Sequence, residues 1–132
     1  MQTFKKEERL SSKKVITTLF SRGHSFYISP FKVIWMDIAP SVTDTKIPVQ
    51  ILITVSKTTL CKAVDRNKIK RLCREAYRKN KASLHDFLHE NNKQCAFILI
   101  YKGKDIPSFK ETEEKIGLIL RRLQEEYEKI AK

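Results

Sequence analysis

Residues 55–78 read VSKTTLCKAVDRNKIKRLCREAYR and join the end of a β-branched strand to a long basic helix. We predict the strand at residues 49–57 and the helix at 61–81, with Asp65 as its N-cap. At 100° per residue the helix divides into two adjacent faces. The apolar face must pack on a sheet and carries Ile69, Leu72, Cys73, Ala76 and Tyr77. The second face carries Arg66, Asn67, Lys70, Arg71, Arg74 and Arg78.

The cations of this helix are arranged in a way that is unfavourable without a partner. Like charges stand four residues apart at Arg66/Lys70, Lys70/Arg74 and Arg74/Arg78, and each such pair costs roughly 0.2–0.5 kcal/mol. They lie near the helix N-terminus, where the macrodipole disfavours cations. Arg outnumbers Lys, which suits bidentate contacts with phosphate. A solvated helix face would mix both signs, so we favour a helix that binds a polyanion.

The net charge of the chain is gathered in the same region. The 132 residues, which fit a single domain over 1–132, carry a formal net charge of +12. Residues 61–81 hold nine basic and two acidic side chains, and residues 1–24 hold six and two. Residues 105–132 hold six basic and seven acidic side chains. Charge of one sign that is clustered in this way repels itself unless an oppositely charged partner relieves it.

Nucleic acid is the polyanion that this pattern favours. A helix that lies on a membrane surface needs bulky apolar residues beside its basic face, and here the core requires those residues. Aromatic side chains at the other basic end of the chain could stack on bases or could belong to the core: Phe20, Phe26, Tyr27, Phe31 and Trp35. Aromatic and basic residues without a DNA-binding motif indicate RNA rather than DNA.

The remaining pattern predicts helices on a small sheet. Residues 1–11 form a basic tail, followed by a helix that begins at Ser11 or Ser12 and ends at Gly23. Residues 26–39 form a strand that Pro30 interrupts or borders, and this strand could pair with 49–57 as a hairpin. In that strand, Phe31 shares one face with Val33 and Trp35, and Lys32 shares the other with Ile34, Met36 and Ile38.

A second helix–strand–helix series completes the chain. Residues 83–90 continue as a short helix, and residues 96–103 form a β-branched strand that Gly103 ends. Ser108 and Glu111 form a capping box after Pro107, and a stripe of Ile116, Leu120, Leu123, Tyr127 and Ile130 follows. Helices layered on a sheet in this order predict a small α/β fold.

Other kinds of chemistry have weaker support in the sequence. No segment approaches the roughly 18 apolar residues of a membrane span, and three cysteines without a CxxC pair indicate a cytoplasmic protein. His85 and His89 could form half of a zinc site, but a surface helix is the better interpretation. Cys73 has cationic neighbours that could activate it, yet it falls on the packing face. We find no catalytic constellation of residues, and a stand-alone nuclease is disfavoured.

Several motifs resemble the protein subunit of bacterial ribonuclease P. The stretch VSKTTLCKAVDRNKIKRLCREAYR is similar to the family pattern of V-S-K, a turn, K-A-V and then R-N-R-x-K-R-x-x-R-E. The opening FKKEERLSSKKVITTLFSRGHSF and the strand AFILIYKGK also fit, so the resemblance covers nearly the whole chain. Lys68 replaces the second Arg of the motif, and Cys61 stands where Gly is usual. The turn after Lys57 is one residue longer than in the family.

The resemblance implies both a fold and a function. The fold would be a two-layer sandwich, αβββαβα, with a mixed four-stranded sheet and a left-handed βαβ crossover, where the general rule predicts a right-handed one. The chain would be the accessory subunit of an endonuclease that removes the 5′ leader of precursor tRNA. Ribonuclease P RNA would carry the Mg²⁺-dependent catalysis, and no catalytic or metal-binding residue is expected in the polypeptide.

The resemblance also assigns roles to residues. Contacts with the RNA subunit would come from Arg66, Asn67, Lys68, Lys70, Arg71, Arg74 and Arg78. A cleft for the single-stranded leader would contain Phe20, Phe31, Lys57, Lys62 and Lys102. The alternative from another class is a structural RNA-binding protein of the ribosome or of ribosome assembly, which would share the basic helix and would not affect tRNA processing.

Overall fold

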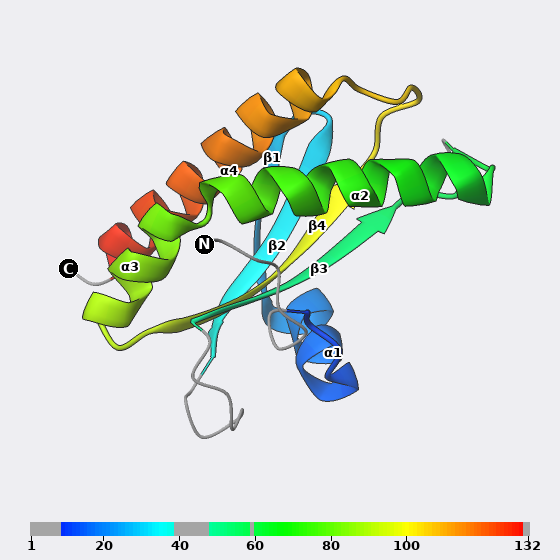
Figure 1. Ribbon diagram of the computed structural model, residues 1–132. Coiled ribbons are helices and arrows are strands. Elements are labelled where there is room, and N and C mark those ends of the chain that lie inside the picture. The colour runs from blue at the N-terminus through cyan, green and yellow to red at the C-terminus, as the bar shows by residue number, and fades with distance from the viewer. Residues whose placement is uncertain (1–8, 39–47, 59, 131–132) are drawn as a thin grey trace.

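The computed structural model describes residues 9–38, 48–58 and 60–130, which fold into four helices around one four-stranded sheet (Figure 1). In chain order the elements are α1 (Lys13–Arg22), β1 (His24–Ile28), β2 (Phe31–Ile38), β3 (Val49–Val55), α2 (Ala63–Asn80), α3 (Ala82–Glu90), β4 (Gln94–Tyr101) and α4 (Phe109–Ile130). The predicted fold class is confirmed, and so is the short helix expected at residues 83–90, which is α3. None of the described helices is long and apolar enough to span a membrane.

The predicted interruption of the 26–39 strand at Pro30 is confirmed. A turn at Ser29–Pro30, whose peptide bond is cis, divides this stretch into β1 and β2, which pair antiparallel. Proline has no N–H to donate to a ladder, so it fits the turn better than a strand interior. The sheet order is β1-β2-β4-β3, so β2 pairs with β4 rather than with β3. The suggested hairpin between residues 26–39 and 49–57 is therefore wrong.

The connection between the two parallel strands, β3 and β4, has an unusual handedness. β3 and β4 run parallel, and α2 and α3 connect them. In Figure 1 the helix α2 lies in front of the sheet, both strands point to the upper right, and β3 lies to the lower right of β4. A chain that leaves a strand, crosses the near face and returns on the left of that strand makes a left-handed crossover, the rarer sense. This is the handedness that the family resemblance implied.

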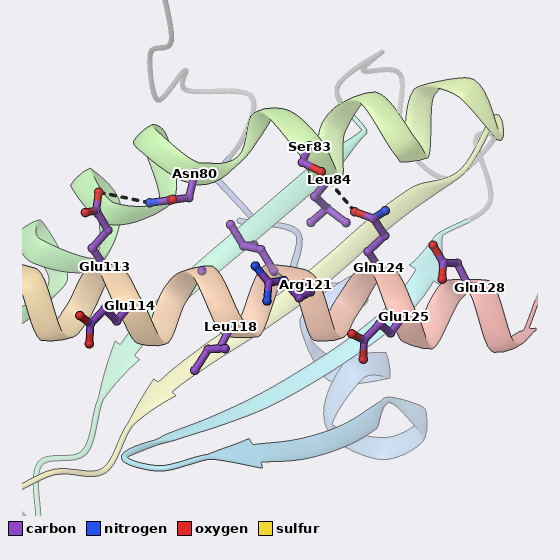
Figure 2. A pocket seen from close by; sticks show the side chains of 12 residues that line it. Asn80, Ser83, Leu84, Glu113, Glu114, Leu118, Arg121, Gln124, Glu125 and Glu128 are labelled. Carbon is purple, nitrogen blue, oxygen red and sulfur yellow. Dashed lines mark hydrogen bonds between the residues drawn. The ribbon is translucent and has the colours of Figure 1, made fainter.

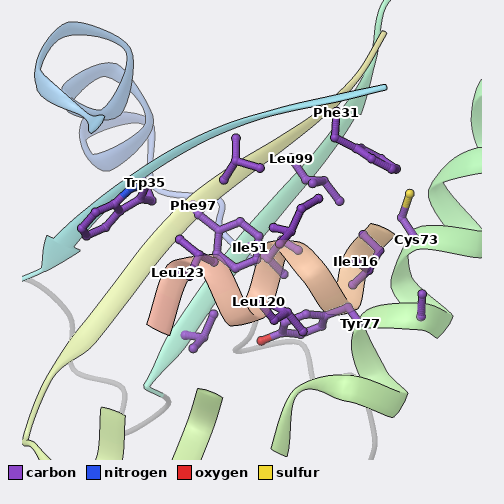
Figure 3. Packing of buried hydrophobic residues seen from close by; sticks show 14 of the residues in the cluster. Phe31, Trp35, Ile51, Cys73, Tyr77, Phe97, Leu99, Ile116, Leu120 and Leu123 are labelled. Carbon is purple, nitrogen blue, oxygen red and sulfur yellow. The ribbon is translucent and has the colours of Figure 1, made fainter. Parts of the chain in front are cut away.

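The larger hydrophobic core fills the space between the sheet and the helices α2, α3 and α4 (Figure 3). As predicted, Ile69, Cys73, Ala76 and Tyr77 of α2 are buried, while Leu72 is half-buried. The stripe of α4 is buried as well at Ile116, Leu120, Leu123 and Tyr127. The strands contribute Phe31, Val33, Trp35, Ile51, Phe97 and Leu99. Three helices thus cover one face of the sheet.

Among the described helices, α1 alone packs on the opposite face, over a smaller core. Val15 and Leu19 of this helix pack with Ile34, Ile38 and residues of β4. Ser12 accepts a hydrogen bond from the Val15 N–H at 3.3 Å, so it is the N-cap. Gly23 ends the helix as predicted, and packing requires a glycine there. A Cβ at this position would lie 2.4 Å from the Leu19 carbonyl oxygen and 2.8 Å from Ile34 Cγ2.

The structure corrects the prediction that residues 1–11 are a tail. The Leu10 side chain is buried, and its N–H donates to the Ile51 carbonyl oxygen at 2.9 Å. This bond uses the open edge of β3, the last strand of the sheet. Arg9 and Leu10 therefore belong to the fold, and residues 1–8 lie outside the described residues.

The two long helices begin differently. α2 begins at Ala63 after Lys62, and no side chain caps it, so the prediction of Asp65 as N-cap is wrong. Asp65 lies instead in the first turn, where a carboxylate favours the helix dipole. The predicted cap of α4 is confirmed, because Ser108 Oγ accepts a hydrogen bond from the Glu111 N–H at 3.1 Å.

Candidate RNA-binding surfaces

The predicted RNA-contact residues of α2 form a row on its outer side, which we call the α2 row. It consists of six cations and one amide: Arg66, Asn67, Lys68, Lys70, Arg71, Arg74 and Arg78. Burial of Ile69 and Cys73 fixes the rotation of the helix about its axis. Asn67, Lys68 and Arg71 are consequently exposed, and the other members are half-buried. The row offers several cations along one helix, which is suited to a line of phosphates.

Two members of the α2 row have structural partners. The Arg66 guanidinium donates from Nη1 to the carbonyl oxygens of Leu60 at 2.9 Å and Cys61 at 2.7 Å, and so fastens the turn before α2. Arg78 Nε donates to Glu75 Oε2 at 3.0 Å, and this bond lowers the pKa of the Glu75 carboxyl. Arg66 therefore positions the start of the helix, and Arg71 is better placed than Arg78 for direct contact with RNA.

A second basic and aromatic surface lies on the sheet face where α1 packs, which we call the α1-side face. Tyr27 of β1 pairs with Lys32 of β2, and Lys32 pairs with Ile100 of β4. The Tyr27 side chain is 61% exposed, and the Nζ atoms of Lys32 and Lys102 each lie 5.7 Å from its ring centroid. Phe20, in the last turn of α1, is also 61% exposed. Aromatic rings and ammonium groups therefore meet on this face.

Phe31 does not belong to this surface, contrary to the prediction. Its side chain is 1% exposed and packs edge-on against Tyr101, with ring centroids 5.2 Å apart, under α2 and α4. Strand alternation already placed Phe31 and Lys32 on opposite faces, so the sequence contained the signal against Phe31. Tyr27 was missing from the predicted cleft because its side of the sheet depends on the β1–β2 turn.

The three predicted lysines are all exposed, at the end of the sheet where β3 and β4 finish. Lys57 lies in the turn after β3, and the Ser56 N–H donates to the Tyr101 carbonyl oxygen at 3.1 Å, which ties that turn to the end of β4. Lys102 follows Tyr101 directly, and Lys62 precedes α2. These lysines extend the positive charge from the α1-side face towards the start of α2.

Comparison with known proteins identifies the family. The family model described as Ribonuclease P matches residues 4–124. The chain belongs to the ribonuclease P protein family. Two curated relatives are named ribonuclease P protein component. The one from Porphyromonas gingivalis strain W83 is 32% identical over 119 residues, covering 89% of this chain and 84% of its own. The one from Chlorobium phaeobacteroides is 30% identical over 131 residues, covering 94% and 90%.

Solved structures of ribonuclease P proteins have the same fold. The protein from Thermotoga maritima superposes with a TM-score of 0.66 at 25% identity, covering 87% of this chain and 96% of its own. A 2.0 Å structure from Staphylococcus aureus gives a TM-score of 0.67 at 20% identity, covering 88% and 94%. The family resemblance, the fold class and the main functional prediction are thereby confirmed, and membership of the ribonuclease P family implies an RNA partner. None of these comparisons favours the ribosomal alternative.

Two of the cysteines and His85 have structural surroundings in this ribonuclease P fold. Burial raises the pKa of the Cys73 and Cys95 thiols to about 12, so Cys73 is inert as predicted. His85 Nε2 lies 2.7 Å from the Tyr77 hydroxyl oxygen, which gives it a structural role. Among residues 9–38, 48–58 and 60–130, no three His, Cys, Asp or Glu side chains gather in a group that could hold a metal ion.

An acidic groove lies beside α4, on the side of the sheet away from the α1-side face. It has a volume of about 730 Å³ and runs between α4 and the junction of α2 with α3 (Figure 2). Its rim carries Glu113, Glu114, Glu125 and Glu128, with Arg121 among them. Carboxylates repel phosphates, so the charge of this groove is unfavourable for contact with RNA.

Proposed function

We propose that the chain binds ribonuclease P RNA through the α2 row and the 5′ leader of precursor tRNA through the α1-side face. Leader removal, which produces the mature tRNA 5′ end, would be catalysed by the RNA subunit with the protein as accessory. The observation that carries this proposal is that two basic surfaces lie on opposite sides of one sheet in a ribonuclease P family member. The place of action would be the bacterial cytoplasm.

The α2 row has the properties of a site for a folded RNA. Its exposed members, Asn67, Lys68 and Arg71, project from a helix whose other side is held in the core. The helix backbone is already ordered, so binding has to order only the rotamers of these side chains. Arginine and lysine contacts with phosphate release counterions, which makes the affinity strongly dependent on salt. The helix can thus bind the phosphates of an RNA without contacts that depend on the base sequence.

The α1-side face has the properties of a site for an unpaired strand. Single-stranded RNA exposes its bases, which stack on aromatic side chains such as Phe20 and Tyr27. Lys32, Lys57 and Lys102 would take the phosphates of the same strand. Stacking is tolerant of sequence because every base has a π-face. This tolerance suits a leader whose sequence varies from one precursor to another.

Magnesium would be held by the RNA in this proposal. The described part of the protein does not bring together the carboxylates that an all-protein Mg²⁺ site requires. RNA phosphates supply the oxygen ligands that Mg²⁺ prefers. The protein would instead contribute positive charge, which lowers the concentration of divalent ions needed for the two RNAs to associate.

Reconstitution tests the proposal. The protein is added to a bacterial ribonuclease P RNA and precursor tRNA at low Mg²⁺, and leader cleavage is timed. We expect stimulation by the wild-type protein, reduced stimulation by Arg71→Ala, and full stimulation by Arg121→Ala, which removes an exposed cation from the acidic groove instead. Absence of stimulation by the wild-type protein, together with co-sedimentation with ribosomal subunits, would reject this function in favour of the ribosomal one.

A further inference from the structure

We infer that Tyr27, Lys32 and Lys102 form a binding position for one unpaired nucleotide, separate from the position at Phe20. The Tyr27 ring would stack on the base, and the two ammonium groups would take the phosphates on either side of it. The inference rests on the proposed leader-binding role of the α1-side face. It goes further by assigning a single nucleotide to three named residues.

The setting of Tyr27 distinguishes it from an ordinary surface tyrosine. Single exposed aromatic residues are common and need no explanation. Here, however, two cations from different parts of the chain share one ring, since the Nζ atoms of Lys32 and Lys102 each lie 5.7 Å from its centroid. Lys32 belongs to β2, and Lys102 follows the end of β4. The fold therefore brings two like charges to the same exposed ring.

Two ammonium groups at one ring repel each other, and the ring compensates for only part of that repulsion. At exposed sites each cation–π contact contributes about 0.5–1 kcal/mol. Phosphate is a far better counter-charge, and charge-assisted hydrogen bonds to it are roughly twice as strong as neutral ones. A strand of RNA that reaches this site would draw both lysines to its phosphates. The ring face that they leave is then available to the base between those phosphates.

The backbone around the site is already fixed in the free protein. The Lys102 N–H donates to the Pro30 carbonyl oxygen at 2.9 Å, which ties the end of β4 to the β1–β2 turn. Tyr27 and Lys32 are cross-strand partners two positions from that turn. The three side chains therefore start from a rigid frame, and binding has to order only their own rotamers.

Phe20 lies in a different element, so it would hold a different nucleotide. It belongs to the last turn of α1, and that helix ends at Gly23, which packs on Ile34 near the middle of β2. Tyr27 lies at the turn end of β1, beside the first residues of β2. A strand that runs along the α1-side face would meet the two rings in succession.

A thermodynamic cycle tests the assignment on the reconstituted holoenzyme. The affinity for precursor tRNA is measured with an abasic nucleotide placed at each leader position in turn, for the wild-type protein and for Tyr27→Ala. We expect Tyr27→Ala to weaken binding about tenfold, near the low end for loss of one stacked base. At one leader position the abasic nucleotide should weaken binding of the wild type by the same factor and should add nothing to Tyr27→Ala.

Matched variants separate stacking from other effects of the substitution. Tyr27→Phe keeps the ring and should bind as the wild type does, whereas Tyr27→Leu keeps apolar bulk and should resemble Tyr27→Ala. Lys32→Ala and Lys102→Ala should each reduce the dependence of log affinity on log salt by about 0.7, the value for one phosphate contact with a single strand.

The outcomes distinguish this inference from the function on which it rests. Coupling at one position, different from the position that couples to Phe20→Ala, supports the inference. Three results for Tyr27→Ala would overturn the inference while leader binding stands. They are an equal loss of affinity whichever leader nucleotide is abasic, no loss of affinity, and coupling at the same leader position as Phe20→Ala. If leaderless tRNA binds the holoenzyme as tightly as precursor tRNA, and Phe20→Ala changes nothing, the proposed leader function fails as well.

Discussion

The two faces of the sheet differ in how much of each is covered by helices. One face is closed by α2, α3 and α4 over a core that includes Phe31, Trp35 and Phe97, all 1% exposed. Of the helices in the described part of the chain, α1 alone lies on the other face, and the strand residues Lys32, Leu52 and Ile100 remain half-buried there. The closed face provides the stability of the fold, and the open face is left available for contact with a partner.

The difference shows how one small sheet can serve two RNAs. The closed face holds α2 by its apolar side, so the α2 row points away from the sheet on that side of the molecule. The open face keeps Phe20 and Tyr27 accessible on the other side. A protein with a net charge of +12 places its acidic groove elsewhere, beside α4. The charge distribution thus separates the two basic surfaces from one acidic groove.

The largest expected effect of a single substitution is in the closed core. Phe97→Ala removes a fully buried ring between the sheet and the helices and should lower the free energy of unfolding by about 3–5 kcal/mol. Leu52→Ala, on the open face, should cost only about 1–2 kcal/mol because its side chain is half-buried. Urea denaturation measures both values. Equal losses would show that the two faces contribute alike to stability.

The attachment of α1 is the next feature to test. Gly23→Ala would place a Cβ 2.4 Å from the Leu19 carbonyl oxygen, so the helix end must shift, at a cost of about 1–3 kcal/mol. Gly117→Ala in α4 is the matched control, since a Cβ there meets nothing within 4 Å. The control should stabilise the protein by about 0.5–1 kcal/mol through helix propensity. Thermal unfolding of both variants gives the comparison, and a neutral Gly23→Ala would contradict the packing role of Gly23.

How far sequence alone predicts this molecule depends on whether a feature is local. The two faces of α2 follow from a 3.6-residue period, so Ile69, Cys73 and Tyr77 were predicted correctly as core. The pairing of β2 with β4 joins segments about sixty residues apart, and no local pattern encodes it. Phe31 was assigned to the leader cleft because the family resemblance placed it there. The alternation of its own strand, which groups it with Val33 and Trp35, pointed to the core instead. Tyr27 was one of five candidate aromatic residues, and its position beside Lys32 follows only from the β1–β2 register.

The smallest expected effect concerns the ion pair within the α2 row. The hydrogen bond from Arg78 lowers the pKa of Glu75 in the folded state. The pair therefore stabilises the fold above the usual pKa of a glutamate, and this contribution is lost as the pH falls through the lowered folded value. Relative to the wild type, Glu75→Gln should be slightly less stable at neutral pH and equally stable in acid. In an Arg78→Ala background the pH-dependent effect of the substitution should be smaller, because only the weaker attraction of Lys79 remains. An undiminished effect would contradict the role of Arg78.

The separation of the two RNA-binding surfaces is tested most directly by measuring two binding equilibria for the same pair of variants. Arg71→Ala should weaken binding to ribonuclease P RNA alone and reduce its salt dependence by about 0.7–0.9, the value for one phosphate contact. It should leave the preference of the holoenzyme for precursor over mature tRNA unchanged. Phe20→Ala should leave binding to ribonuclease P RNA alone unchanged and should reduce the preference of the holoenzyme for precursor over mature tRNA. If both variants change the same equilibrium and leave the other intact, the two faces do not hold different RNAs.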